Sequence, residues 1–370
     1  MEQNFYLEKL LKLKENFSVK IISGIRGVGK STLLKTFADT LKAQGEEIIF
    51  IDCEENPQLK TFRQLYEFVD AKTAELNKFF LLIDEADRVD EWEKAINALF
   101  AGAPAEIYIA GSSYSLAENI SALLPENCDV LKMYPLSFAE YEKISPTENA
   151  LENYLHLGGM PAALNADKKV LRGLAYEILF DIAEKNYLSD SALLRTLVKY
   201  LARNVGNAVS VADYFRGLGE NNPRKVRNYL NHVLDSGFFK KLPRLDAKTN
   251  NFMTGGERFY CVDNGILSAL AEVDDKILME NTVCNELLRR DFEISNGKCG
   301  AMNINFVATK SDRKIYIQIL SPDGSITVRK ITRPLRALPD DAEKLLITLK
   351  PVKEFGGIKS ITLHEFLTNV

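Results

Sequence analysis

Apolar runs that end in glycine or acidic residues dominate the first third of the chain. Residues Val19–Ser23 are apolar enough for a buried strand, and the apolar positions from Leu33 to Leu41 repeat at helical spacing. Two later runs, 78–84 and 106–110, also have the length and composition of buried strands. Strands that alternate with helices predict an α/β fold around a parallel sheet.

The apolar spacing changes in the second half of the chain. A first helix is predicted from residue 191, Ser210 with Asp213 can cap a second, and Asn222 with Pro223 opens a third. The run 238–242 then begins a hairpin, which completes a winged helix-turn-helix over 191–250. Further on, 301–308 and 314–320 are typical of paired strands around a turn at 310–313, so a terminal sheet is expected.

Length and composition narrow the class of protein. The 370 residues suggest two or three domains, and 46% apolar with 26% charged residues is typical of a folded globular chain. Apolar runs stay far below the ~20 residues of a spanning helix, and the N-terminus lacks a signal-peptide pattern. A cytoplasmic protein without a membrane partner is expected. Five scattered cysteines and three dispersed histidines lack the spacing of a zinc site or a Ser-His-Asp triad.

A glycine-rich segment follows the first predicted strand and precedes the first predicted helix. It reads Gly24, Ile25, Arg26, Gly27, Val28, Gly29, Lys30, Ser31 and Thr32, which is a P-loop in its strand, loop and helix setting. Glycines let successive backbone N–H groups curl around a phosphate, and the helix N-terminus adds positive potential. We expect Lys30 to reach the β- and γ-phosphates and the Ser31 hydroxyl to bind Mg²⁺.

The strand predicted over 78–84 ends in the acidic pair Asp84 and Glu85, as a Walker B motif does. At the carboxyl end of a neighbouring strand, Asp84 is expected to hold the Mg²⁺ water shell, and Glu85 to orient or deprotonate the attacking water. The strand over 106–110 ends in a Gly-Ser-Ser run, and its last residue, Ser113, is the predicted sensor of the γ-phosphate or the lytic water. The predicted catalytic residues are therefore Lys30, Glu85 and Ser113.

Other P-loop classes fit less well. GTPases usually read guanine with an Asn-Lys-x-Asp motif, and the pair Asn77 and Lys78 is followed by two phenylalanines. A small-molecule kinase rarely needs paired acids after the strand, nor a long chain beyond the nucleotide domain. The predicted ligands are therefore ATP and Mg²⁺, with hydrolysis favoured over phosphoryl transfer.

Taken together, the motifs resemble those of prokaryotic AAA-type ATP-binding proteins that join an N-terminal P-loop ATPase domain to a C-terminal restriction-nuclease-like domain of unknown function. The resemblance rests on the P-loop, on the Walker B run with Trp92 after it, on 111–113, and above all on the Tyr-Pro-Leu-Ser-Phe-Ala-Glu-Tyr stretch at 134–141; it continues at 157–161, 259–265 and 280–287. It implies an ATPase core over 1–146, a helical lid over 147–190, a winged helix over 191–250 and the terminal domain over 251–370. Related ATPases place a proline such as Pro161 beside adenine.

The chain departs from the family pattern near the end of the core and at the sensor. Asn127 stands where we align the arginine of a Gly-Arg pair, so this place does not supply an arginine finger to a neighbouring subunit. Serine replaces the frequent sensor asparagine at Ser113, although a hydroxyl can still form the hydrogen bond.

The terminal domain departs further from the metal-binding pattern of restriction-nuclease-like folds. Asn303 and Asn305 stand where the family pattern has Glu-x-Asp, and Leu320 replaces any lysine two residues after Gln318. Neutral amides make poor Mg²⁺ sites, and Glu286 alone does not build a nuclease. We therefore expect a catalytically degenerate domain that is structural or binds a protein partner.

Basic residues gather in the predicted winged helix. Between Leu193 and Lys248 there are eleven Lys or Arg and four Asp or Glu, although the whole chain has a formal net charge of −4. A basic segment inside an acidic protein favours an anionic polymer as partner. In its third helix the outward residues are Arg224, Lys225, Arg227, Asn228 and Asn231, which suit the phosphates and bases of double-stranded DNA. The alternative is a winged helix that packs as a structural spacer.

Two functional interpretations stay open. In the first, an ATPase couples hydrolysis to a winged helix and a terminal domain that bind DNA or a protein partner. In the second, the chain is a nucleotide-gated binding switch with little or no turnover. Glu85 favours the first and Asn127 favours the second. An ATP-regulated nuclease is a further alternative, which the terminal amides disfavour, and assembly into oligomers is compatible with each.

Overall fold

The computed structural model describes residues 4–368 except 15, 17, 74–75, 103–104, 114, 125–126, 210–215, 221 and 340. The chain divides into two units. Unit 1 runs through Tyr134 and adds Glu184–Tyr187 and Asp235–Gly237, whereas unit 2 comprises Pro135–Ala183, Leu188–Leu234 and the chain from Phe238 onward. The chain thus leaves the first unit at Tyr134 and returns to it in two short segments.

A parallel sheet forms the centre of unit 1. Its strands, in the described part of the chain, are β1 (Val19–Ser23), β2 (Ile48–Asp52), β3 (Phe79–Asp84), β4 (Ala105–Gly111) and β5 (Cys128–Lys132), in the order β2-β3-β4-β1-β5. All pairings are parallel, and Ile21 of β1 lies opposite Ile109 of β4 and Val130 of β5. The predicted α/β class is confirmed. β1, which precedes the P-loop, and β3, which ends in Asp84, are separated by β4.

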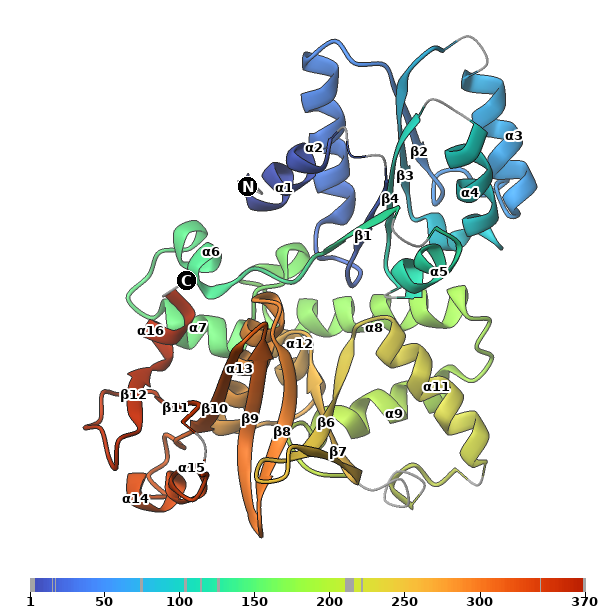
Figure 1. Cartoon of the computed structure of the whole chain (residues 1–370). Helices are drawn as coiled ribbons and strands as arrows, with labels where there is room; N and C mark the ends of the chain where they lie inside the picture. Colours follow the sequence, from blue (N-terminus) through green and yellow to red (C-terminus); the bar gives the residue numbers. More distant parts are fainter. Residues whose placement is uncertain are drawn as a thin grey trace. The chain divides into compact units, whose positions relative to one another are not determined.

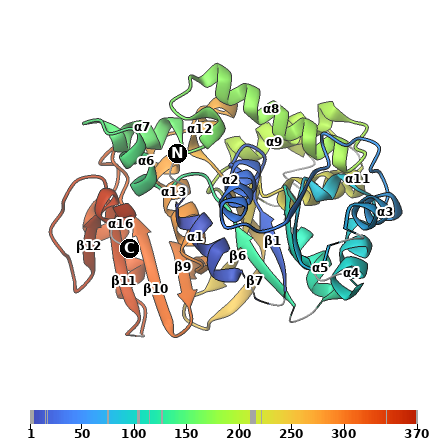
Figure 2. The ribbon, with the colours of Figure 1, turned by 90° about the horizontal axis from the view of Figure 1, so that it is seen from above.

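Helices cover both faces of this sheet (Figures 1 and 2). One face carries α1 (Asn4–Leu13) and α2 (Lys30–Ala43), and the other carries α3 (Phe62–Thr73), α4 (Trp92–Gly102) and α5 (Ser115–Leu123). Under α2, the rings of Phe37 and Tyr108 have their centroids 4.7 Å apart. On the opposite face, Ile21, Leu81 and Ile109 belong to one buried cluster with residues of α3 and α4. Alternate side chains of β1, β3 and β4 therefore enter separate cores, which explains the continuous apolar runs of these three strands.

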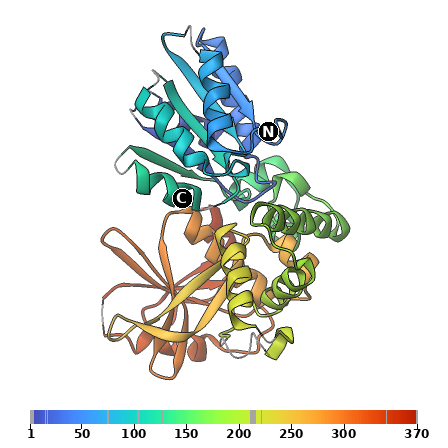
Figure 3. The same ribbon diagram turned by 90° about the vertical axis from the view of Figure 1, so that its right-hand side faces the viewer.

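Unit 2 contains helices followed by a second sheet (Figures 1 and 3). The first helices are α6 (Phe138–Ile144), α7 (Ala150–Leu157), the 3-10 helix η2 (Pro161–Ala163), α8 (Lys168–Lys185), α9 (Ser191–Arg203) and α11 (Pro223–Asp235). The sheet follows the order β12-β11-β10-β9-β8-β6-β7 among the described residues. Its strands are β6 (Phe239–Asp246), β7 (Asn251–Cys261), β8 (Glu293–Cys299), β9 (Met302–Lys310), β10 (Arg313–Ile319), β11 (Glu343–Thr348) and β12 (Lys359–Thr362). The remaining helices are α12 (Asn264–Leu270), α13 (Asp275–Arg289), α14 (Val328–Ile331), α15 (Arg333–Arg336) and α16 (Leu363–Thr368).

The hairpin expected as the wing belongs to this second sheet. β6 and β7 pair in antiparallel fashion, and β6 also pairs in parallel with β8, where Arg244 lies opposite Asn296. The boundary expected at residue 250 therefore falls in the turn between β6 and β7, and both strands continue the terminal sheet. The expected cap of the second helix, Ser210 with Asp213, lies outside the described residues.

The third helix of the basic segment, α11, is amphipathic as predicted, but its buried face differs in detail. Val226 and Val233 are buried, whereas Leu230 and Leu234 are only half-buried. Tyr229, which the sequence pattern did not single out, is also buried, and its hydroxyl accepts a hydrogen bond from the Asp190 amide at 2.9 Å. The phenol gives a helix with few apolar residues a further anchor.

Two of the motifs that carry the family resemblance meet inside unit 2. The buried carboxylate of Asp263 accepts hydrogen bonds from the amides of Gly159 at 2.7 Å and Ile266 at 3.0 Å. Burial raises the pKa of Asp263, and these amides oppose the increase. A Cβ atom on Gly265 would lie 1.9 Å from the carbonyl oxygen of Leu157, so glycine is required there. The segments 157–161 and 262–265 thus form one junction between α7 and α12, which lie side by side (Figures 1 and 2).

Within the described ranges, the helices lack the combination of length and apolarity that crossing a membrane requires.

Candidate functional site

The P-loop connects β1 to α2 in unit 1. Gly27 and Gly29 have φ angles of 84° and 100°, in the left-handed region that favours glycine, and Gly29 is the N-cap of α2. At Gly24, a Cβ atom would lie 2.6 Å from the backbone oxygen of Met133. The glycine positions of the motif therefore follow from backbone geometry and close packing at the N-terminus of α2, the end of a helix that attracts anions.

Lys30 begins α2 and turns back over the loop. Its side chain is 4% exposed, and Nζ donates to the carbonyl oxygen of Ile25 at 3.3 Å. Burial lowers the pKa of this ammonium; Glu85 opposes the shift and Lys185 adds to it. The P-loop lysine thus lies in the same electrostatic environment as the acidic residues after β3.

Asp84 ends β3 as a buried carboxylate. Its Oδ1 accepts a hydrogen bond from the Glu85 amide at 3.1 Å, whereas Oδ2 has no hydrogen-bond partner among the described residues. Burial raises the pKa of Asp84, and a hydrogen bond with Ser31 opposes the increase. A carboxylate oxygen without a donor beside a hydroxyl is a donor set that fits Mg²⁺, which prefers hard oxygen ligands.

Glu85 lies in the left-handed region of the backbone, with φ 52°, and caps the 3-10 helix η1 (Ala86–Arg88). The side chain is buried, and its Oε2 accepts a hydrogen bond from Lys185 Nζ at 2.7 Å. Burial would raise the pKa of Glu85, but Lys185, Lys30 and Arg88 outweigh it and lower the pKa to about 2. The predicted catalytic carboxylate is therefore ionised and bound to a cation from another part of unit 1.

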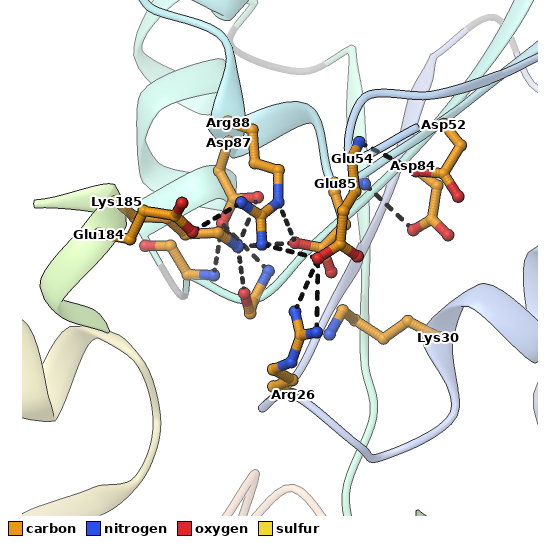
Figure 4. A network of polar contacts seen from close by, with 12 residues as sticks. Arg26, Lys30, Asp52, Glu54, Asp84, Glu85, Asp87, Arg88, Glu184 and Lys185 are labelled. Atoms are coloured by element: carbon orange, nitrogen blue, oxygen red, sulfur yellow. Dashed lines mark hydrogen bonds and ion pairs between the residues drawn. The ribbon is translucent and has the colours of Figure 1, made fainter. Parts of the chain in front are cut away.

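Lys185 also binds the residues after β4, at the centre of the network in Figure 4. Its Nζ lies 3.1 Å from both carboxylate oxygens of Asp87 and donates to the Ser112 hydroxyl. Asp87 Oδ2 accepts the amides of Ser112 and Ser113, each at 3.1 Å. The hydroxyl of Ser113, the predicted sensor, donates to Asp235 at 2.7 Å. At the end of β4, the hydroxyl that contacts the acidic cluster is thus that of Ser112.

Surface ion pairs surround this network. Glu54 Oε1 lies 3.4 Å from Arg26 of the P-loop and 3.1 Å from Arg88. Arg88 also pairs with Glu184 at 2.9 Å. The partly exposed pairs are worth little individually, but they link the P-loop, η1 and the segment that carries Lys185 (Figure 4).

Sequence reasoning missed Lys185, Asp87 and Arg88. Asp87 and Arg88 follow the Walker B pair directly, so their proximity was a usable signal. Lys185 is 100 residues from Glu85, and the sequence around it carries no motif that points to the nucleotide site.

In the terminal domain, the amide residues of the degenerate motif lie together, but the acid beside them is Glu280 rather than Glu286. Asn305 Nδ2 donates to Glu280 Oε2 at 2.8 Å, and the backbone amide of Asn305 donates to Gln318 Oε1 at 3.3 Å. Glu280 Oε1 accepts from the Tyr260 hydroxyl at 2.7 Å.

Glu286 pairs instead with Arg289 at 3.3 Å and with Arg290 at 2.7 Å. Sequence reasoning selected the wrong acid of the run 280–287, because position on a helix does not reveal which residue faces a neighbouring strand.

The basic helix α11 keeps most of its expected outward residues exposed: Arg224, Arg227, Asn228 and Asn231. Lys225 is an exception, because its Nζ binds Asp190 at 2.7 Å and lies 3.6 Å from Glu220. Lys225 is therefore partly neutralised by acids of its own unit. Pro161 opens η2 in unit 2, and its contact with adenine stays a prediction.

The chain matches two protein-family models. Residues 16–142 match the model described as an AAA domain, and residues 148–277 match one described as a domain of unknown function (DUF8612). A Haemophilus influenzae protein described as uncharacterized is 29% identical over 390 aligned residues, which cover 98% of this chain and 97% of that protein.

Solved structures of a replication initiator are similar at a low level. DnaA bound to AMPPCP and single-stranded DNA has a TM-score of 0.33 and 15% identity, and covers 63% of this chain and 88% of its own. AMPPCP-bound DnaA from Aquifex aeolicus has a TM-score of 0.30 and 14% identity, with coverage of 64% and 89%. Likenesses at this level say nothing about function. Residues 16–142, which carry the P-loop and the parallel sheet, are therefore similar to AAA domains, and residues 148–277 are similar to a domain of unknown function.

Proposed function

We propose that unit 1 binds Mg-ATP and hydrolyses it. The observation that carries the proposal is the convergence of four residues, Lys30, Ser31, Asp84 and Glu85. The buried lysine shares an electrostatic environment with Glu85, Ser31 lowers the pKa of Asp84, and Asp84 Oδ2 has no donor within the described chain. A glycine-rich turn without function would not need the buried Lys30 beside two buried acids, Asp84 and Glu85, since burial of each charge is costly.

Each residue has a distinct part in the proposed reaction. The backbone amides of the P-loop cradle the phosphates, and Lys30 donates to the β- and γ-phosphates. Ser31 and Asp84 would hold Mg²⁺, which neutralises phosphate charge during the transfer. Glu85 accepts a hydrogen bond from the attacking water and so orients it towards the γ-phosphate.

Nucleotide state would be coupled to unit 2. The lid helices and the terminal sheet belong to the same unit, and α8 runs from unit 2 into unit 1 at Glu184. We propose that binding and release of ATP change how unit 2 engages DNA or a protein partner.

Calorimetry with Mg-ATP and a phosphate-release assay on the full chain, with and without duplex DNA, test the proposal. Binding with turnover supports it. Binding without turnover favours the nucleotide-gated switch instead. Absence of binding overturns both.

The exposed arginines of α11 favour DNA as the partner, and salt dependence is the expected signature. Neutralising Z phosphates gives a log-log salt slope near −0.9Z. Replacing Arg224 and Arg227 with alanine should therefore make the slope shallower by about 2, as measured by fluorescence anisotropy on duplex DNA. Arg313→Ala, which removes an exposed arginine paired with Glu343, is the matched control and should leave the slope unchanged. A DNA affinity that does not change with salt concentration would contradict DNA binding by α11 and favour a structural role for this helix.

We do not expect metal-dependent nuclease activity in the terminal domain. Glu280 accepts hydrogen bonds from Tyr260 and Asn305 and lies 3.5 Å from Arg258. Its oxygens are thus already engaged, and the residues next to it are amides, which Mg²⁺ and Mn²⁺ bind poorly. Incubation with single- and double-stranded DNA and RNA should give no cleavage with either metal. Cleavage that Glu280→Gln removes would make the protein an ATP-regulated nuclease.

A further inference from the structure

Lys185 is a cation of the network that the proposed reaction does not use. Its side chain is 9% exposed, and its Nζ binds Glu85, Asp87 and Ser112. It is the last residue of α8, and the chain through Ala183 belongs to unit 2 while Glu184–Tyr187 belongs to unit 1. The contact therefore lies where the chain passes from one unit to the other.

The contact occupies an oxygen of Glu85, the carboxylate that orients water in the proposed reaction. Glu85 Oε2 accepts from Lys185 Nζ at 2.7 Å, the distance of a strong charge-assisted hydrogen bond. A carboxylate held by an ammonium has a lower capacity to accept from a water molecule, because the ammonium both occupies the oxygen and neutralises its charge.

The other acid does not depend on Lys185 to the same extent. Asp87 Oδ2 also accepts two backbone amides, from Ser112 and Ser113. Withdrawal of Lys185 would leave Asp87 bonded to these donors. If the Lys185 ammonium moves away, Asp87 therefore keeps two hydrogen-bond donors and only Glu85 loses its close cation.

Neighbouring contacts set the position of the segment. Glu184 pairs with Arg88 at 2.9 Å, and the hydroxyl of Tyr187 donates to Asp90 at 3.2 Å. Both partners lie just after the Walker B pair. Each of these contacts involves an exposed side chain of the segment and is worth little individually, but both help to hold the segment that carries Lys185.

We propose that Lys185 is a positioning residue that restrains Glu85, and that ATP turnover rises when the end of α8 withdraws Lys185 from the carboxylate. This inference rests on the proposed ATPase function and names its regulation. Because the rest of α8 belongs to unit 2, a partner that engages unit 2 can act on turnover through this one side chain.

Replacement of Lys185 with methionine, which keeps the aliphatic stem, tests the restraint. We expect kcat for ATP to rise about tenfold, as the loss of one charge-assisted hydrogen bond allows, with KM and the calorimetric affinity for Mg-ATP nearly unchanged. Lys185→Arg, which keeps the cation, should return kcat to the wild-type value. Lys169→Met, at an exposed position of the same helix, is the matched control and should leave turnover unchanged.

A second variant covers the case in which Lys185→Met fails to fold, as judged by circular dichroism. Glu184→Gln combined with Tyr187→Phe leaves Lys185 in place and loosens its segment, so kcat should rise by a smaller factor. A general loosening of the fold would not raise kcat at constant KM.

The outcomes separate the restraint from the ATPase function. An equal or lower kcat in folded Lys185→Met that still binds Mg-ATP overturns the restraint and leaves the ATPase function intact. Failure of the wild-type protein to bind Mg-ATP overturns the ATPase function itself.

Discussion

Lys30→Ala should weaken Mg-ATP binding by about a hundredfold, because it removes the cation that faces the β- and γ-phosphates and its charge-assisted hydrogen bonds. Lys30 is buried and bonded to the Ile25 carbonyl, so its ammonium is already directed over the loop. Isothermal titration of wild type and variant with Mg-ATP gives the ratio of dissociation constants.

Lys35→Ala is the matched control for this experiment. Lys35 is an exposed lysine on the same helix and should leave affinity unchanged. An unchanged affinity in Lys30→Ala would remove the P-loop from the binding site. Thermal melting without nucleotide separates loss of binding from loss of fold.

Glu85→Gln should lower kcat by about a hundredfold or more while the chain still binds ATP, since a water-orienting carboxylate acts mainly in the transition state. Glutamine keeps the shape of the side chain but is a weaker acceptor. Steady-state phosphate release and retention of labelled ATP on the protein measure the two effects.

The control for Glu85→Gln is Glu54→Gln, which changes an acid at the edge of the same network that contacts Arg26 and Arg88. It should change turnover much less. Equal turnover in wild type and Glu85→Gln would exclude Glu85 from the chemistry.

The elements around the P-loop could be predicted from the sequence because local patterns specify them. The P-loop falls between a strand and a helix that the apolar spacing already predicts, and both elements form as expected, β1 over Val19–Ser23 and α2 from Lys30. A glycine motif and a buried strand are set by neighbouring residues, so sequence spacing alone locates them. The positive φ angles of Gly27 and Gly29 follow the same local logic.

Long-range pairing was not readable in the same way. The sequence of residues 78–113 does not predict that β4 lies between β1 and β3. Apolar strands of similar length can occupy any of these places in a parallel sheet. The β6 and β7 hairpin was assigned to a wing for a similar reason: a hairpin sequence specifies its own turn but not the strand that pairs with its outer edge. Here that strand is β8.

Side-chain partners were the hardest to foresee. Lys185 and Glu85 meet although 100 residues separate them, and a lysine at the end of a helix is usually solvated. Glu280 and Glu286 share a helix, yet only tertiary packing decides that Glu280 meets Asn305 and Glu286 meets two arginines. Motif spacing therefore located the candidate site, and the fold supplied the residues that regulate it.

The hydrogen bond from the Gly159 amide to Asp263 joins the segment after α7 to the start of α12, so neither segment is complete without the other. A fragment that stops at residue 250 would leave the Gly159 amide without its carboxylate acceptor and would also remove Gly265, which packs against the Leu157 carbonyl. Exchange of segments between relatives should therefore succeed only when residues 157–161 and 262–265 come from the same parent. Among relatives, the residues of these two segments are then expected to change together rather than independently.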